Sequence, residues 1–129
     1  MMKIEFTVSD HNFDHDVLAS TEPVVVQFTA SWCSPCVRYE PVLKAAHAVF
    51  GEGVRLARMD IDDNQTIPQR YGVVNVPTLL MFYRGKVLRA IEGIQDQDSL
   101  VEAFRALAAQ TGGAPPRSIF GDTGRIAPR

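Results

Sequence analysis

Blocks of apolar residues separated by polar turns recur along the chain and predict alternating strands and helices. Residues 24–28 are apolar except for Gln27, which is typical of a central strand covered on both faces. Short apolar runs of this kind predict strands at residues 3–8, 23–30, 54–60, 78–83 and 86–92. Helical spacing of apolar residues predicts helices at residues 9–20, 33–50, 64–71 and 97–110. This order predicts an α/β domain with a parallel core, an antiparallel hairpin and helices on both faces.

Capping residues and prolines refine the boundaries of the predicted helices. Ser9 or Asp10 is expected to cap the first helix, and Asn64 is expected to begin the third. Pro41 lies inside the second helix, where its missing amide is expected to produce a kink. The first helix is expected to face the core with its apolar residues, Phe13, Val17 and Leu18.

The last part of the chain differs in composition from the rest. Residues 112–129 carry four of the nine glycines and three of the eight prolines. Such a composition is typical of a flexible segment, so we expect a folded domain at residues 1–111 followed by a C-terminal extension. The alternative is that Ile119 and Phe120 dock on the domain or on a neighbouring molecule.

Composition and charge limit the partners and the location that this chain is expected to have. Its net charge of −2 and the lack of a basic stripe argue against a nucleic-acid partner. The first residues hold no apolar segment long enough for a signal peptide. No run approaches the roughly 18 apolar residues that a membrane-spanning helix requires. We therefore expect a cytoplasmic protein that does not associate with membranes.

The only two cysteines, Cys33 and Cys36, lie three residues apart where a strand is followed by a helix. The free amides and the dipole of a helix N-terminus favour a thiolate, which is the form that attacks a disulfide. Cys33 is therefore the expected nucleophile, and Cys36, one turn later, is the expected resolving thiol. The alternative is half of a zinc site, but structural zinc takes four ligands. Only two cysteines are present, and the three histidines are expected to be surface residues, so we expect no metal.

Several short motifs, in order and with matching spacing over residues 2–111, make the chain resemble the thioredoxin family. The central motif is Trp32-Cys33-Ser34-Pro35-Cys36, with Pro41 after it. The other matching segments are residues 12–18, 60–62, 71–73 and 76–80, and Gly93. The resemblance implies a thioredoxin fold, with a central mixed five-stranded sheet flanked by four helices.

The resemblance also implies an activity, the reduction of protein disulfides through a Cys33/Cys36 dithiol couple. Ser34 and Pro35 are implied to help set the reduction potential of that couple. No glycine-rich nucleotide motif is present, so we expect no cofactor, and electrons are expected from an NADPH-dependent thioredoxin reductase. The expected partners are protein disulfides, and the expected oligomeric state is a monomer.

Residues outside the cysteine motif are implied to bind the substrate. Trp32 borders the nucleophile, where an exposed aromatic ring can pack on a docked protein. Val76-Pro77 resembles the cis-proline dipeptide of the family, which leaves the Val76 backbone free to pair with an extended substrate. The expected apolar groove beside Trp32 is completed by Val73, Val74, Gly93 and Ile94. Gly93 is expected to permit a close approach of the backbone.

Three positions depart from the family pattern. Gln27 stands where thioredoxins commonly have a buried aspartate, which is implied to accept the Cys36 proton. Glutamine cannot titrate, so we expect slower deprotonation of Cys36 and a pH–rate profile with one fewer group. Arg58 replaces the lysine that partners that aspartate, and is expected either to lie unpaired near the sulfurs or to turn toward Asp60 or Asp62. Thr29 stands where many thioredoxins have a second tryptophan.

These departures leave a second function open. A protein of the same fold can hold clients in its apolar groove and use its cysteines slowly or as a redox switch. Gln27, Thr29 and the C-terminal extension favour this chaperone-like alternative. The two functions differ in turnover, because a reductase is abolished by Cys33→Ser whereas a holding protein still suppresses aggregation of its clients.

Overall fold

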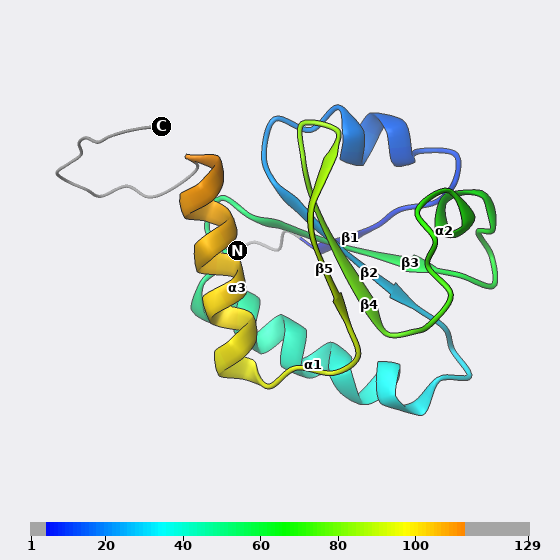
Figure 1. The fold of residues 1–129 in the computed structure, drawn as a ribbon. Helices are drawn as coiled ribbons and strands as arrows, with labels where there is room; N and C mark the ends of the chain where they lie inside the picture. The colour runs from blue at the N-terminus through cyan, green and yellow to red at the C-terminus, as the bar shows by residue number, and fades with distance from the viewer. Residues whose placement is uncertain (1–4, 113–129) are drawn as a thin grey trace, which may run out of the picture.

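A five-stranded mixed sheet forms the centre of the molecule in the computed structural model, which describes residues 5–112 (Figure 1). Along the chain the elements are β1 (Glu5–Thr7), the short π-helix η1 (Asp14–Leu18), β2 (Val24–Thr29), α1 (Ser34–Val49), β3 (Arg55–Asp60), α2 (Thr66–Arg70), β4 (Thr78–Tyr83), β5 (Lys86–Glu92) and α3 (Gln97–Thr111). Within residues 5–112, none of these helices has the length and apolar character needed to cross a membrane. The predicted α/β architecture is confirmed.

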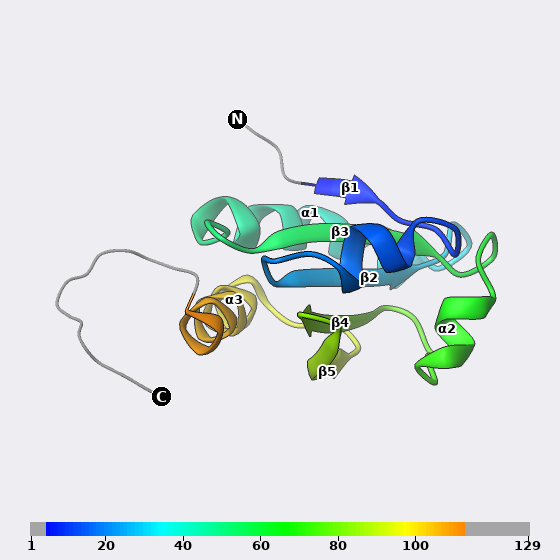
Figure 2. The same ribbon diagram turned by 90° about the horizontal axis from the view of Figure 1, so that it is seen from above.

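The strands are arranged in the order β1-β3-β2-β4-β5, as Figure 2 shows from above. β2 is central, runs parallel to β3 and antiparallel to β4, and is buried along nearly its whole length. β4 and β5 form the predicted antiparallel hairpin. Arg84 and Gly85 connect them with positive φ angles of 49° and 83°, as a tight hairpin turn requires. The central strand therefore ends between neighbours that run in opposite directions.

Helices cover both faces of the sheet and create two apolar cores. α1 and α3 pack on one face, and η1 and α2 lie on the other (Figure 1). On the α1 side the sheet contributes Val25, Leu56, Leu79, Met81 and Ile91. On the η1 side it contributes Val24, Val26, Phe28, Ala57, Met59, Leu80 and Phe82. Burial of consecutive β2 residues on opposite faces confirms the prediction of a doubly covered central strand.

The first predicted helix, at residues 9–20, is mostly wrong. Only Asp14–Leu18 is helical, although Phe13 and Val17 are buried as expected. Ser9 does not cap this helix, because its hydroxyl accepts hydrogen bonds from the amides of His11 and Asn12, which lie before the helix begins. Such local side-chain bonds compete with helix formation and favour a turn.

Asp10 caps a different helix from the one predicted. Its carboxylate accepts hydrogen bonds from the amides of Thr66 and Ile67, at 3.0 and 2.9 Å, at the start of α2. Asn64 does not begin that helix, but its side chain joins Asp60 to the Asp10 backbone. The N-terminal loop and α2 are thus fastened together by groups more than fifty residues apart.

β4 and β5 have the predicted bounds, and the other remaining elements begin and end within two residues of theirs. α1 continues as a helix through Pro41 and ends at Val49. β1 is confirmed over Glu5–Thr7. The expected flexibility of the C-terminal extension and the docking of Ile119 and Phe120 concern residues outside the described part of the chain.

Replacing Asp10 with alanine is expected to reduce the free energy of unfolding by about 1 kcal/mol, because α2 loses its cap. Burial acts to raise the pKa of Asp10. The amides of residues 65–67 and the neighbouring His11 outweigh burial, so the pKa is lowered from its ordinary value of 3.8. The contribution of the carboxylate is therefore present above about pH 4 and is lost as the pH falls through the depressed folded-state pKa.

Urea denaturation at neutral and acidic pH measures this effect. Asp63→Ala, which removes a nearby exposed acid, is the control and is expected to change stability by less than about 0.5 kcal/mol. An equal loss in both variants, or a loss for Asp10→Ala that persists below the folded-state pKa, would contradict the capping role.

Candidate active site at the start of α1

Cys33 and Cys36 form a disulfide where β2 gives way to α1. Their Cα atoms are 5.2 Å apart. Cys33 is the N-cap of α1, while Ser34 and Pro35 are the first two residues of the helix. A proline is tolerated there because the first amides of a helix have no partner within it. Both sulfur-bearing residues are buried, Cys33 at 5% exposure and Cys36 at 0%, so only Cys33 is open to an incoming partner.

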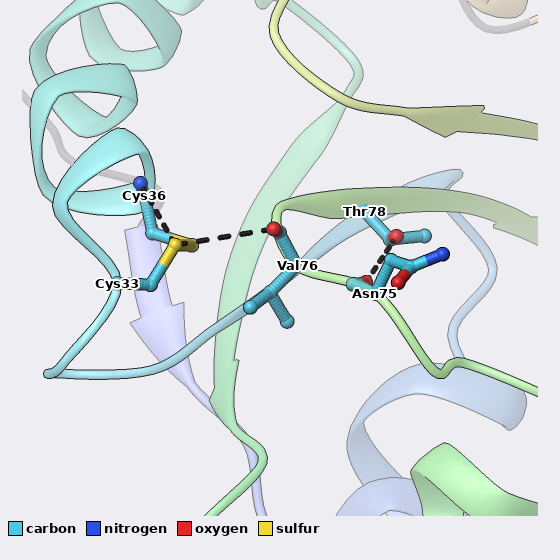
Figure 3. The surroundings of a disulfide bond; sticks show 5 residues. All are labelled: Cys33, Cys36, Asn75, Val76 and Thr78. Atoms are coloured by element: carbon cyan, nitrogen blue, oxygen red, sulfur yellow. Dashed lines mark hydrogen bonds between the residues drawn. A yellow bond between two sulfur atoms is a disulfide. The ribbon is translucent and has the colours of Figure 1, made fainter.

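The helix N-terminus points a hydrogen-bond donor at the Cys33 sulfur. The amide of Cys36 donates to Cys33 Sγ at 3.2 Å, as Figure 3 shows. α1 has 16 residues, so its dipole also places partial positive charge at this end. In the reduced protein both features favour the Cys33 thiolate over the thiol, and hence the form that attacks disulfides.

The Val76-Pro77 peptide lies against the disulfide and is cis, as the resemblance implied. The Val76 carbonyl oxygen is 3.9 Å from Cys33 Sγ (Figure 3). Strand register explains the placement, because Thr78 at the start of β4 pairs with Phe28 near the end of β2. The loop before β4 is fastened by a hydrogen bond from the Thr78 hydroxyl to the Asn75 carbonyl, at 2.6 Å.

Gly93 joins the same site from the end of β5. Its amide donates to the Pro77 carbonyl at 2.9 Å. A Cβ atom at Gly93 would meet nothing of the described chain within 4 Å, so packing within the chain does not require glycine here. The residue has a φ of +83°, a backbone angle that residues other than glycine rarely adopt. Glycine is needed here for its backbone angle.

Exposed apolar side chains lie next in the chain to residues of this site. Trp32 precedes Cys33 and is 65% exposed, while Val74 is 80% exposed and Ile94, next to Gly93, is 50% exposed. Val76 and Ile61 are half-buried and pack against the two cysteines. Sequence reasoning missed Val37, which is 57% exposed on the first turns of α1. Its spacing of four from Cys33 on a helix is the signal that identifies it.

Gln27 is buried beneath α1, at 2% exposure. Alternation along β2 places it on the same face as Val25, and hence on the α1 side of the sheet. Its Nε2 atom has no hydrogen-bond partner among residues 5–112. Buried amide groups normally have a partner, so this atom marks a place for a bound water or another acceptor.

Arg58 is not unpaired and does not turn toward Asp60 or Asp62, so this sequence prediction is wrong. Its guanidinium pairs with the carboxylate of Glu40 on α1. The Glu40 side chain is 24% exposed and that of Arg58 is 45% exposed. Sequence reasoning missed Glu40, although its position four residues after Cys36 places it one helical turn away.

A cleft of about 250 Å³ opens beside the cysteine motif. Its wall is shared with the active site, because Ala30 lines the cleft and also packs against Cys33 and Cys36. Thr29 lines it where the family resemblance favours a tryptophan. The other lining residues are Thr7, Ser31, Val37, Glu40, Arg58 and Asp60.

Comparison with known proteins assigns this arrangement to a family. The family model for thioredoxin matches residues 5–106. A thioredoxin of Rickettsia bellii is 36% identical over 95 residues, which cover 74% of this chain and 90% of that protein. Thioredoxins of Acidithiobacillus ferridurans and Rhodospirillum rubrum are 41% and 38% identical, covering 62% and 77% of this chain and 74% and 95% of their own. The chain therefore belongs to the thioredoxin family, and its Cys33–Cys36 pair makes it a thiol–disulfide oxidoreductase.

Proposed function

We propose that the protein works in the reducing direction, with Cys33 as the nucleophile and Cys36 as the resolving thiol. The observation that carries this assignment is the hydrogen bond from the Cys36 amide to Cys33 Sγ at the helix N-terminus. It supports a thiolate on Cys33, while the complete burial of Cys36 supports a role that begins only after a substrate is attached.

The reaction proceeds in two displacements. The Cys33 thiolate attacks one sulfur of the substrate disulfide, forming a mixed disulfide and releasing the other substrate sulfur as a thiolate. The Cys36 thiolate then attacks Cys33 Sγ, which forms the Cys33–Cys36 disulfide and releases the second substrate thiolate. Two electrons pass to the substrate, whose two thiolates are protonated from solvent.

Substrate binding is assigned to the backbone and apolar groups around Cys33. The Val76 carbonyl faces the sulfur and is available to an extended substrate strand, with Pro77 and Gly93 fixing that loop. Trp32, Val74 and Ile94 offer exposed apolar area to a protein surface. Ser34 and Pro35, lying between the cysteines, tune the reduction potential.

Other expectations stand as parts of the same proposal. Electrons come from an NADPH-dependent thioredoxin reductase, and the protein acts as a cytoplasmic monomer. Its folded domain is assigned to residues 1–111, with residues 112–129 as an extension. The lack of cysteines outside the motif supports a reducing compartment.

A coupled assay tests the direction of the reaction. Thioredoxin reductase, NADPH and a disulfide-bonded protein are mixed with the wild type, and NADPH oxidation is followed. Rapid turnover that depends on this protein is the expected result. Negligible turnover, together with suppression of aggregation of a reduced client protein, would instead support the chaperone-like alternative.

A further inference from the structure

Glu40 is a carboxylate close to the active site that the mechanism described so far does not use. It lies four residues after Cys36 on α1, so the two side chains project from the same side of adjacent turns. Side chains with this spacing have Cβ atoms about 6 Å apart. The Glu40 side chain is only partly exposed, as expected for a group on the side of α1 that borders the sheet.

The cation that pairs with Glu40 comes from the strand position opposite the buried glutamine. Arg58 on β3 is the register partner of Gln27 on β2, and both residues lie on the α1 side of the sheet. The family pattern places the acid on the central strand and a cation on its neighbour. In this chain the cation is retained, and its acid partner is on the helix that carries Cys36.

The adjoining cleft reaches from this carboxylate to the wall of the active site. Glu40 and Arg58 line the cleft, and Ala30 separates it from the two cysteines. A volume of about 250 Å³ holds several waters, since a water occupies about 30 Å³ in the liquid. The unpartnered Nε2 of Gln27 provides a buried donor that a water between the cleft and Cys36 would satisfy.

We propose that Glu40 accepts the proton of Cys36 during resolution of the mixed disulfide, through a water of this cleft. The S–H bond of Cys36 breaks, its proton passes by way of the water to the Glu40 carboxylate, and the thiolate attacks Cys33 Sγ. The protonated Glu40 then returns the proton to solvent. This assignment rests on the proposed roles of the two cysteines.

The charged groups around Glu40 determine how the reaction responds to pH. They are Arg58 and Asp60 on β3 and Lys44 on α1 itself. The nearby lining residues of β1 and β2 are Phe6, Thr7 and Thr29, none of which carries a charge. Resolution is expected to slow at acidic pH, where a carboxylate acceptor becomes protonated. On this proposal the pH–rate profile keeps a carboxylate group despite Gln27, whereas the sequence alone predicts one fewer group.

Stopped-flow reaction of the reduced protein with one equivalent of 5,5′-dithiobis(2-nitrobenzoate) separates the two displacements. Attack by Cys33 releases the first coloured thiolate, and attack by Cys36 on the mixed disulfide releases the second. For Glu40→Gln the second phase is expected to be about 10²-fold slower at neutral pH, the low end of general-base effects. The first phase is expected to stay unchanged, and the acid limb of the second is expected to disappear.

Glu102→Gln is the matched control, because Glu102 is also an ion-paired carboxylate on a helix, bonded to Arg105 away from the active site. It is expected to leave both phases unchanged. A Glu40→Gln second phase within about twofold of the wild type, from about pH 4 to about pH 9, would overturn the proposal, because this range covers ordinary carboxylate and thiol pKa values.

A double variant distinguishes proton transfer from a purely structural role of Glu40. Gln27→Asp in the Glu40→Gln background restores an acid next to Arg58, and is expected to recover the second phase and its acid limb. No recovery in a folded double variant would contradict the assignment. A second phase that persists in Cys36→Ser would instead refute the proposed cysteine roles, whatever Glu40→Gln shows.

Discussion

Replacing Cys33 with serine is expected to lower turnover of protein disulfides by at least about 10³-fold, because a serine hydroxyl cannot serve as a thiolate nucleophile at neutral pH. The structure concentrates the activating contacts on this sulfur. The Cys33 sulfur accepts a hydrogen bond from the Cys36 amide at 3.2 Å and lies beside the Val76 carbonyl. NADPH oxidation in the coupled assay, compared with a reaction lacking the protein, measures the loss.

The matched variant for this prediction is Cys36→Ser, which removes the other thiol and leaves the nucleophile in place. It is expected to be equally inactive in turnover but to retain a substrate as a mixed disulfide on Cys33, visible on a non-reducing gel and released by dithiothreitol. Trapping by Cys33→Ser through Cys36 would reverse the roles. Substantial turnover by either variant would contradict a dithiol mechanism.

The centre of the site is predictable from sequence because its parts are local. Only two residues separate Cys33 from Cys36, and the strand before them and the helix after them are each recognisable from a short apolar pattern. The Val76-Pro77 dipeptide is predictable only through the family resemblance, since its approach to Cys33 depends on the pairing of β4 with β2. Glu40 could also have been found from sequence, because it lies four residues after Cys36 on the same helix. Its pairing with Arg58 could not, because Arg58 is on β3, far away in the chain.

Errors in the predicted fold also arise from contacts between residues that are far apart in the chain. Local capping rules assigned Asp10 to the helix that follows it, whereas its carboxylate satisfies amides of α2. The fold brings Asp10 near the start of a second helix. The sequence around Asp10 does not show which of the two helix N-termini its side chain caps. At Gly93 the residue type was informative, but sequence cannot distinguish a positive φ from a crowded contact, and the structure requires the first.

Replacing Phe82 with alanine is expected to reduce the free energy of unfolding by about 3–5 kcal/mol, the usual range for truncating a buried aromatic ring. Phe82 on β4 is fully buried in the core on the η1 side. Its ring meets those of Phe13 and Tyr71 edge-on, with centroids 5.3 and 5.2 Å away. Removing the ring leaves a cavity and abolishes both ring contacts. Urea denaturation followed by circular dichroism measures the lost free energy of unfolding.

Val87 supplies a control at the same rung of the sheet, because it pairs with Phe82 on β5 but is 40% exposed. Val87→Thr keeps a β-branched side chain and is expected to change stability by less than about 0.5 kcal/mol. Comparable losses in the two variants would show that strand pairing, and not the aromatic cluster, stabilises this end of β4.

The position of Phe82 also separates stability from activity. The active-site loop joins β4 at Thr78, at the opposite end of the strand, and its Val76 packs on the two cysteines as well as on the core that holds Phe82. Folded Phe82→Ala protein is therefore expected to exchange disulfides at the wild-type rate well below its unfolding temperature. A rate that falls in proportion to the lost stability would mean that the aromatic cluster also positions the Val76 carbonyl beside Cys33.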